Sequence, residues 1–334
     1  MLRPIGFALC GLFLVALAVV CYRRPIPDDF DRYMYEAIIL TRSQPADAVY
    51  EKVKHENPRA EESTVLDSPQ HMVELEPLYA TRPFYLKLVS WVGMFVPIQH
   101  AINFVSAASF LGIGIVVLFW TQRPLHTALL MLVYQILNLG RAGTPDALAA
   151  LLVICSLWLI EVHGLKYLAL GLLFFSLGVR TDSVLVLIAV LAWLAWEKQI
   201  PSYVAGLGVL LAMAIVLTIN HWVGNYGWIV LFRYSFIGGK YPAQIPHTLT
   251  VREYLSGFSA GIGTVLTQLA IWILIGILSW TRKQNPLLIV VSASLIAHFL
   301  LFPSAEARYL LWGGIVATVT LIRSLDEGSS LRRL

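Results

Sequence analysis

The chain has 334 residues, of which 58% are hydrophobic and 13% charged, and its mean hydropathy is +0.72. A soluble domain carries about 25% charged residues, so this chain has too little polar surface to coat a soluble globule. The same composition excludes a disordered chain, a collagen and a disulfide scaffold. Its net charge of +4 comes from basic residues scattered between apolar runs, which form no patch for a nucleic acid. The sequence therefore predicts an all-α polytopic membrane protein.

Apolar runs that approach the roughly 20 residues of a membrane-spanning helix recur along the chain. We expect about ten transmembrane helices in a single membrane domain that covers residues 1–334. The first run could be a signal peptide, but no small-x-small cleavage site precedes Arg23, so we expect a retained anchor. The expected spans are residues 4–22, 100–120, 125–140, 146–162, 165–179, 183–197, 203–222, 259–280, 286–302 and 308–323.

Basic residues in the short connections set the expected orientation. With both termini inside, nine of them fall on the cytoplasmic side and three on the other side. This bias predicts a multi-pass protein of the inner or plasma membrane, N-in and C-in, with residues 324–334 as a cytoplasmic tail. The nine are Arg3, Arg123, Lys166, Lys198, Arg282, Lys283, Arg323, Arg332 and Arg333, and the three are Arg141, Arg180 and Arg308.

Two long polar segments then face outward, residues 23–99 and residues 223–258. Loops of this length are uncommon unless they are functional or contain structure of their own, so we expect amphipathic helices in the first. Within it, residues 84–97 are apolar but too short for a span, which favours an interfacial or re-entrant helix.

Ionisable residues gather on the same outer side. Each short outer connection contains an acid close to a base, and the long loop adds several more. Charged groups at membrane depth are costly and are usually paired or functional, so we expect a reaction centre at the outer face. These residues are Arg141 and Asp146, Arg180 and Asp182, Glu306 and Arg308, and, in the long loop, Asp28, Asp29, Asp31, Arg32, Glu36 and Arg82.

Plainer roles stay open for some of these residues. Asp28 follows a proline and could cap a helix. Asp28, Arg32 and Glu36 are spaced as an exposed ion-pair ladder would be. Asp146 and Asp182 also stand where helices are expected to begin.

Patterns typical of metal and nucleotide sites are missing from the sequence. The eight histidines have no ligand spacing, so we interpret them, His298 included, as structural or solvated. No CxxC pair, Gly-rich phosphate loop or HExxH motif occurs. We therefore expect neither a metal nor a nucleotide cofactor.

The motifs of the outer segments resemble those of the GT-C glycosyltransferases in their order along the chain and in the side of the membrane on which they lie. These integral membrane enzymes include protein O-mannosyltransferases and the lipid A aminoarabinose transferase. PDDFDRYMYEA resembles the acidic motif that opens the family's long outer loop, and RPFYLKLVSW resembles its later basic-Pro-aromatic segment. TPDALAALL and VRTDSVLVLI resemble its mid-chain helix starts, and EARYLL resembles its late acidic-x-Arg-Tyr element.

This resemblance implies an enzyme that moves a sugar, with inversion, from a polyprenyl-phosphate donor to an acceptor hydroxyl at the outer face. A carboxylate would act as the general base, and arginines would hold the leaving phosphate through their planar forks. The partners implied are the bilayer, the lipid-linked sugar and a glycan, lipid or protein acceptor. The implied residues are Asp29, Asp28 or Asp31 as the base, Arg82, Arg308, Arg180 and Lys240 for the phosphate, and Arg32, Tyr33, Asp146, Asp182, Glu306 and Tyr309 for substrate orientation.

The chain also differs from the family pattern. Two extra residues separate Asp29 from Arg32, so any of the three aspartates could match the family's base. We expect no sizeable soluble C-terminal domain, and fewer spans than in many members, which leaves the acceptor class open.

Two other functions stay open. A transporter or flippase for a lipid-linked sugar would have repeats or matched discontinuous helices, and the sequence indicates neither. In a non-catalytic GT-C-like subunit of envelope polysaccharide assembly, Asp29, Arg82 and Arg308 would not need to lie together in one pocket.

Overall fold

The computed structural model describes residues 2–26, 30–56, 67–239, 241–282, 284–304 and 306–331. Within these ranges the chain is helical and has no strand, which confirms the expected all-α class for the part described. The helices follow most of the predicted apolar runs, because a helix satisfies its own backbone groups where no water is available.

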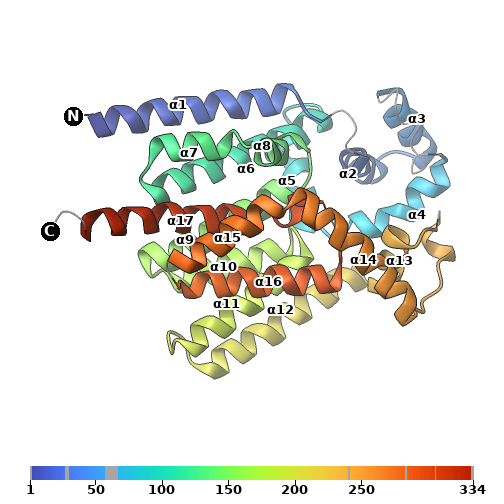
Figure 1. Cartoon of the computed structure of the whole chain (residues 1–334). Coiled ribbons are helices and arrows are strands. Elements are labelled where there is room, and N and C mark those ends of the chain that lie inside the picture. Colours follow the sequence, from blue (N-terminus) through green and yellow to red (C-terminus); the bar gives the residue numbers. More distant parts are fainter. Residues whose placement is uncertain are drawn as a thin grey trace.

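The apolar helices form a bundle in which they lie side by side, with both chain termini at the same end (Figure 1). Its core contains large side chains from distant helices, among them Leu14, Phe110 and Leu157, all fully buried. The bundle helices are α1 (Leu2–Arg23), α6 (Ile98–Thr121), α7 (Pro124–Met131), α8 (Tyr134–Arg141), α9 (Asp146–His163), α10 (Lys166–Leu177), α11 (Val184–Trp196), α12 (Ser202–Trp222), α14 (Val251–Gln268), α15 (Ala270–Arg282), α16 (Pro286–Leu301) and α17 (Leu311–Leu331), with the 3-10 turns η2 (Thr181–Ser183) and η4 (Ala307–Tyr309).

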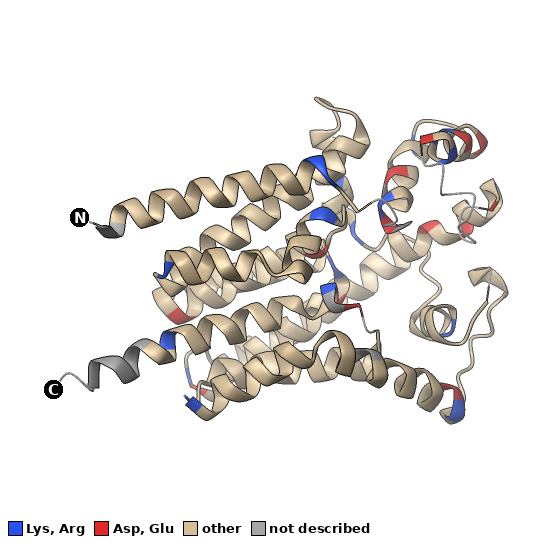
Figure 2. Cartoon of the chain, turned by 45° about the horizontal axis from the view of Figure 1, so that its top comes forward, with Lys and Arg blue, Asp and Glu red and all other residues tan. Residues whose placement is uncertain are grey.

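A second group of helices covers the opposite end of the bundle, and we call it the cap (Figure 1). Part of it packs around a small core of its own that includes Met34, Val49 and Met72. Figure 2 shows acidic and basic residues gathered in the cap and where it meets the bundle, whereas the middle of the bundle has few. The cap consists of α2 (Phe30–Thr41), α3 (Ala46–Glu56), α4 (Pro69–Tyr79), α5 (Pro83–Val92), α13 (Trp228–Phe236) and the 3-10 turn η3 (Pro242–Gln244).

In the part of the chain that the structure describes, four helices are long and apolar enough to cross a membrane: Pro4–Arg23, Ile98–Thr121, Asp146–His163 and Ser202–Trp222. The last exposes large apolar side chains such as Leu207, Leu210 and Leu217, which suit contact with lipid. These helices indicate a membrane-embedded protein.

The ten continuous spans expected from the sequence are not all present. Residues 125–140 form two separate helices, α7 and α8, and residues 259–280 cross from α14 into α15 with a bend of 73°. Helix α14 begins at Val251, within the second outer segment expected over residues 223–258. The runs 165–179, 183–197, 286–302 and 308–323 correspond to shorter apolar helices, Lys166–Leu177, Thr181–Trp196, Pro286–Leu301 and Leu311–Leu325.

The two breaks in these helices are joined by one side chain. Gln135, at the start of α8, donates from Nε2 to the carbonyl oxygen of Gln268 at 2.7 Å, where α14 ends. Its Oε1 accepts a bond of 2.9 Å from Trp272 Nε1 on α15. Since interrupted backbone inside an apolar bundle needs a polar partner, Gln135 satisfies a carbonyl group that lies at the second break.

Residues 84–97, expected to form an interfacial or re-entrant helix, contain most of α5 followed by turns that lead into α6. One face of α5 is buried through Tyr85, Leu86 and Val89. Trp91 and Phe95 are exposed, as amphipathic and aromatic side chains at a membrane surface would be.

Glu161 joins four helices at the end of the bundle that carries the termini. Its carboxylate accepts bonds from Trp120 Nε1 at 2.8 Å and from Asn285 Nδ2 at 3.1 Å, and it lies 3.1 Å from Arg323 Nη1. Two hydrogen-bond donors, on α6 and before α16, and one cation on α17 therefore depend on the same carboxylate on α9.

Replacing Glu161 with alanine is expected to destabilise the protein by roughly 2–3 kcal/mol, because it leaves these donors without their acceptor. Glu161→Gln keeps an acceptor oxygen and is expected to lose less. Unfolding in detergent, followed by circular dichroism, measures both effects. Equal stability of wild type and Glu161→Ala would contradict this role.

Glu36 is a buried carboxyl group in the cap, with 1% of its surface exposed and its Oε2 atom without a hydrogen-bond partner among the described residues. Burial, with Glu56 nearby, raises its pKa from 4.5 to about 7. The folded state therefore holds this proton more tightly than the unfolded chain between these two pH values, and stability falls as pH rises through that window.

Glu36→Gln is expected to remove this pH dependence, which amounts to roughly 3 kcal/mol. Between pH 5 and pH 8 the wild-type protein should lose stability in detergent, and the variant should lose much less. Glu51→Gln, at an exposed position of α3, is the control and should behave as wild type. Parallel pH profiles for wild type and Glu36→Gln would refute the assignment.

Candidate functional site

Six ionisable side chains from five segments meet where the cap joins the bundle. We call them the charge network: Asp31 in the first turn of α2, Asp146 at the start of α9, Arg180 and Asp182 at η2, His298 near the end of α16, and Arg308 in η4. Acids and bases alternate along it, so each charge has a partner of opposite sign from another part of the chain.

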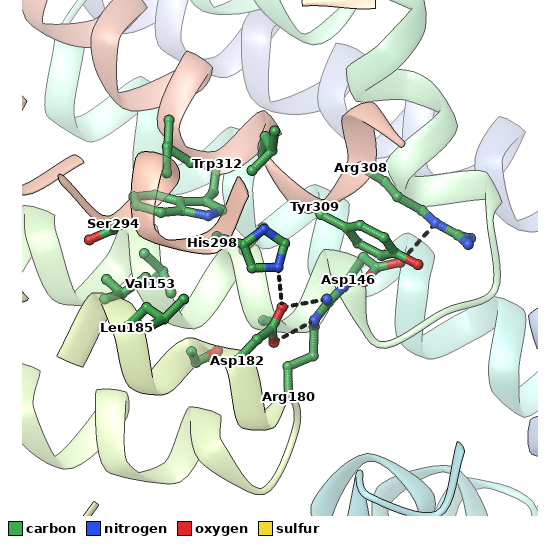
Figure 3. A pocket seen from close by; sticks show the side chains of 16 residues that line it. Asp146, Val153, Arg180, Asp182, Leu185, Ser294, His298, Arg308, Tyr309 and Trp312 are labelled. Carbon is green, nitrogen blue, oxygen red and sulfur yellow. Dashed lines mark hydrogen bonds and ion pairs between the residues drawn. The ribbon is translucent and has the colours of Figure 1, made fainter. Parts of the chain in front are cut away.

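Arg180 is the centre of the bundle side of the network (Figure 3). Its Nε and Nη2 atoms donate to the two oxygens of Asp182 at 2.9 and 2.5 Å, and its Nη1 pairs with Asp146. His298 Nε2 lies 3.0 Å from Asp182 Oδ2. The orientation of the Arg180 guanidinium is thus fixed by two carboxylates.

Arg308 connects this group to the cap. Its Nη2 lies 2.6 Å from Asp31 Oδ2, and its Nε lies 2.5 Å from Glu306 Oε2 and 3.5 Å from Asp146 Oδ2. The guanidinium carbons of Arg180 and Arg308 lie 4.3 and 5.3 Å from the centre of the Tyr309 ring. Cation–π attraction therefore adds to the ion pairs at this point.

Asp31 and Arg82 share a group of buried tyrosines on the cap side. Tyr79 donates its hydroxyl to Asp31 Oδ1 at 3.0 Å, and burial raises the pKa of Tyr79 well above its ordinary value, so the phenol keeps its proton. The Arg82 guanidinium lies 5.6 and 5.7 Å from the ring centres of Tyr35 and Tyr79. It donates to the carbonyl oxygen of Leu78 at 2.9 Å.

The loop before α9 is held from three sides, which places Asp146. Gly143 has φ +67°, a conformation that favours glycine, and its carbonyl accepts a bond from Tyr85 at 3.2 Å. The carbonyl of Thr144 accepts from Ser106 at 3.1 Å, and the Thr144 hydroxyl donates to Asp146 at 2.7 Å. Because α9 begins here, its positive end also favours the Asp146 carboxylate.

A pocket opens beside the network between α9, α11, α16 and α17 (Figure 3). About 440 Å³ of space at this pocket, open solvent included, is not filled by protein atoms. One part of its wall is charged, and another part is apolar. The charged part has Arg180, Asp182 and Arg308, and the apolar part has Val153, Leu185, Val186, Leu295 and Trp312.

The capping role left open for two aspartates receives no support from the geometry. The N-cap residue of α9 is Pro145, and the side chain of Asp146 binds Thr144 and pairs with Arg180. No side-chain cap precedes η2 or α11, and Asp182 pairs with Arg180 and His298. Both carboxylates serve the network instead.

The remaining site residues expected from the sequence divide into two groups. Tyr309 lies at the network, and Glu306 binds Arg308. Tyr33 is buried in the core of the cap, and Arg32 packs against Gly143, with no ion pair between Arg32 and Glu36. Asp28, Asp29 and Lys240 lie outside the described residues.

Several residues of the site were missed by the sequence analysis. His298, interpreted as structural or solvated, binds Asp182 and lines the pocket. Tyr79 binds Asp31 across 48 positions of sequence, and Trp312 stands within an apolar run. Neither spacing nor a motif marks them, so only the fold brings them to the site.

Among the described residues, no three His, Cys, Asp or Glu side chains are grouped as metal ligands, and the need for a metal stays open. Comparisons of the chain with known protein families, curated proteins and solved structures give no match.

Removing the Asp146 carboxylate is expected to destabilise the protein by roughly 3–5 kcal/mol, because Arg180 loses a buried partner and Arg308 a nearby countercharge. Asp146→Ala should therefore lower the unfolding temperature in detergent much more than Asp47→Ala. Asp47 is the matched control, since it also stands in the first turn of a helix but is exposed. Similar losses in the two variants would show that the network adds little stability.

Proposed function

We propose that this protein is a membrane glycosyltransferase of the GT-C type that transfers a sugar from a polyprenyl-phosphate donor. The observation that carries the proposal is a pocket with arginines on one part of its wall and an apolar lining on another, joined to the carboxylate of Asp31 through Arg308. A lipid-linked sugar phosphate has the same two chemistries, a charged group and an apolar chain.

Donor hydrogens for a phosphate remain in the network. An arginine has five N–H donors, and the contacts of Arg180 described above involve three of its nitrogens, each through one hydrogen. The hydrogens left at Nη1 and Nη2 form the fork that suits two phosphate oxygens. Arg82 forms no ion pair with a carboxylate among the residues described, so its charge is also available to an anion.

Asp31 is the candidate base whose position is described. Tyr79 and Arg308 each bind one of its oxygens, and lone pairs remain for an acceptor hydroxyl. The carboxylate would take the hydroxyl proton while the acceptor oxygen bonds to the anomeric carbon. The bond from that carbon to the phosphate oxygen would break, and polyprenyl phosphate would leave. Asp28 and Asp29 remain alternatives for this role.

The proposed placement in the membrane follows from the ends of the bundle. Both termini lie at one end of the bundle and the cap lies at the other (Figure 1), which supports N-in and C-in termini with the site on the outer face. The shorter apolar helices and the two broken ones would complete about ten crossings of an inner or plasma membrane. The acceptor would be a glycan, lipid or protein that reaches the cap.

A lipid-linked sugar transporter or flippase is the second candidate. The broken helices α7–α8 and α14–α15 favour it, because transporters use discontinuous helices at their binding sites. In contrast, Asp31, Arg82 and Arg308 gather around Tyr79 and Tyr309, which favours catalysis over a non-catalytic subunit. Covalent transfer measured against translocation in vesicles separates the transferase from the transporter.

The test uses Asp28→Asn, Asp29→Asn and Asp31→Asn singly and together, assayed for sugar transfer in membranes at matched protein levels. Loss of the base is expected to lower the transfer rate by roughly 10²–10⁴-fold in at least one of them. Donor binding should stay within a few fold, and Asp47→Asn should keep full activity. If the triple variant transfers sugar at the wild-type rate, the proposed base is wrong.

A further inference from the structure

The site has more carboxylates than arginines. Among the described residues, Asp31, Asp146, Asp182 and Glu306 lie within ion-pair distance of Arg180 or Arg308, and Arg82 is the one further guanidinium beside them. A phosphate that enters this site adds negative charge where carboxylates already outnumber guanidinium groups. Because like charges at close range repel strongly in a partly buried site, one carboxylate has to leave when the phosphate binds.

Glu306 is the carboxylate that can leave at the lowest cost. Its side chain is 53% exposed, whereas those of Asp146, Asp31 and Asp182 are 3%, 19% and 32% exposed. The three aspartates also have a second polar partner each, and the carboxylate of Glu306 binds Arg308 alone among the described residues. Moving it into water therefore breaks one contact that solvent already weakens.

The contact also has the geometry of a phosphate site. Nε and Nη2 of an arginine form the fork that binds two oxygens of one phosphate. On Arg308, Nη2 donates to Asp31 Oδ2 at 2.6 Å, and Nε lies 2.5 Å from Glu306 Oε2 without forming a hydrogen bond, so oxygens of two different carboxylates lie beside this fork. Arg308 lines the pocket, so a ligand in the pocket can reach this guanidinium.

We propose that Glu306 occupies the position of the ligand's phosphate on Arg308 and is displaced when the phosphate binds. The inference rests on the proposed function for the identity of the ligand, a phosphate carried on a prenyl lipid. Glu306, expected from the sequence to orient substrate, is then a specificity-determining residue. It shields Arg308 in the empty protein, and only an anion can replace it, so an uncharged prenol gains nothing from this fork.

The test compares Glu306→Gln with the wild-type protein for binding of farnesyl phosphate, farnesol and inorganic phosphate in detergent, by titration calorimetry. Without the competing charge, the variant should bind farnesyl phosphate about 10-fold more tightly, corresponding to about 1.4 kcal/mol. Its affinity for farnesol should not change. Glu253→Gln is the matched control, because Glu253 also pairs with an arginine, Arg233, at 2.8 Å outside the site.

Each outcome has one reading. Unchanged or weaker binding of farnesyl phosphate by Glu306→Gln overturns the inference, as does an equal gain in Glu253→Gln or absence of binding to every protein tested. If Glu306→Gln gains the same affinity for inorganic phosphate as for farnesyl phosphate, the displacement of Glu306 is supported but the site is assigned to free phosphate. A gain for farnesyl phosphate in a protein that transfers no sugar supports the inference and rejects the proposed function alone. Unfolding temperatures that match wild type exclude misfolding as the cause.

Discussion

The structure depends on the pairing of buried charge where the cap meets the bundle. A charge taken out of water needs a partner of opposite sign, and here two of the ion pairs join distant segments: Arg180 meets Asp146 across 34 positions and Arg308 meets Asp31 across 277. Removing one member takes a partner from at least one other member. The network therefore holds α2, α9, η2 and η4 in place relative to one another. As a result it also positions the residues of the pocket wall.

The network also explains why the pocket has two kinds of wall. Its charged residues stand at the starts of α9 and α11 and just before α17, where backbone N–H groups are free and the helix dipole is positive. Farther along the same segments the side chains that line the pocket are apolar, as at Val153, Val186 and Trp312. The division of the pocket wall into a charged part and an apolar part therefore follows from where the helices begin. Such a wall suits an amphipathic ligand whose charged group lies at the cap.

Much of this organisation could be predicted from the pattern of residues along the chain. The features that could not be predicted have physical reasons. Apolar runs mark where helices lie because burial needs apolar surface, so α1, α6, α9 and α12 match their expected ranges closely. The breaks near Val133 and Leu269 contain no Pro or Gly, and a run of apolar residues has no local sign of them. Arg180 and Asp182 could be paired from sequence because they are neighbours. Tyr79 and His298 could not, since only tertiary packing brings them to Asp31 and Asp182.

The shared contact of the two broken helices has a mechanical consequence. Because Gln135 is bound at once to Gln268 and to Trp272, a change of angle at either interruption must stretch or carry the same amide. The broken helix pairs α7–α8 and α14–α15 are thus linked through the side chain of one glutamine. A change of angle at one break would therefore strain a hydrogen bond at the other.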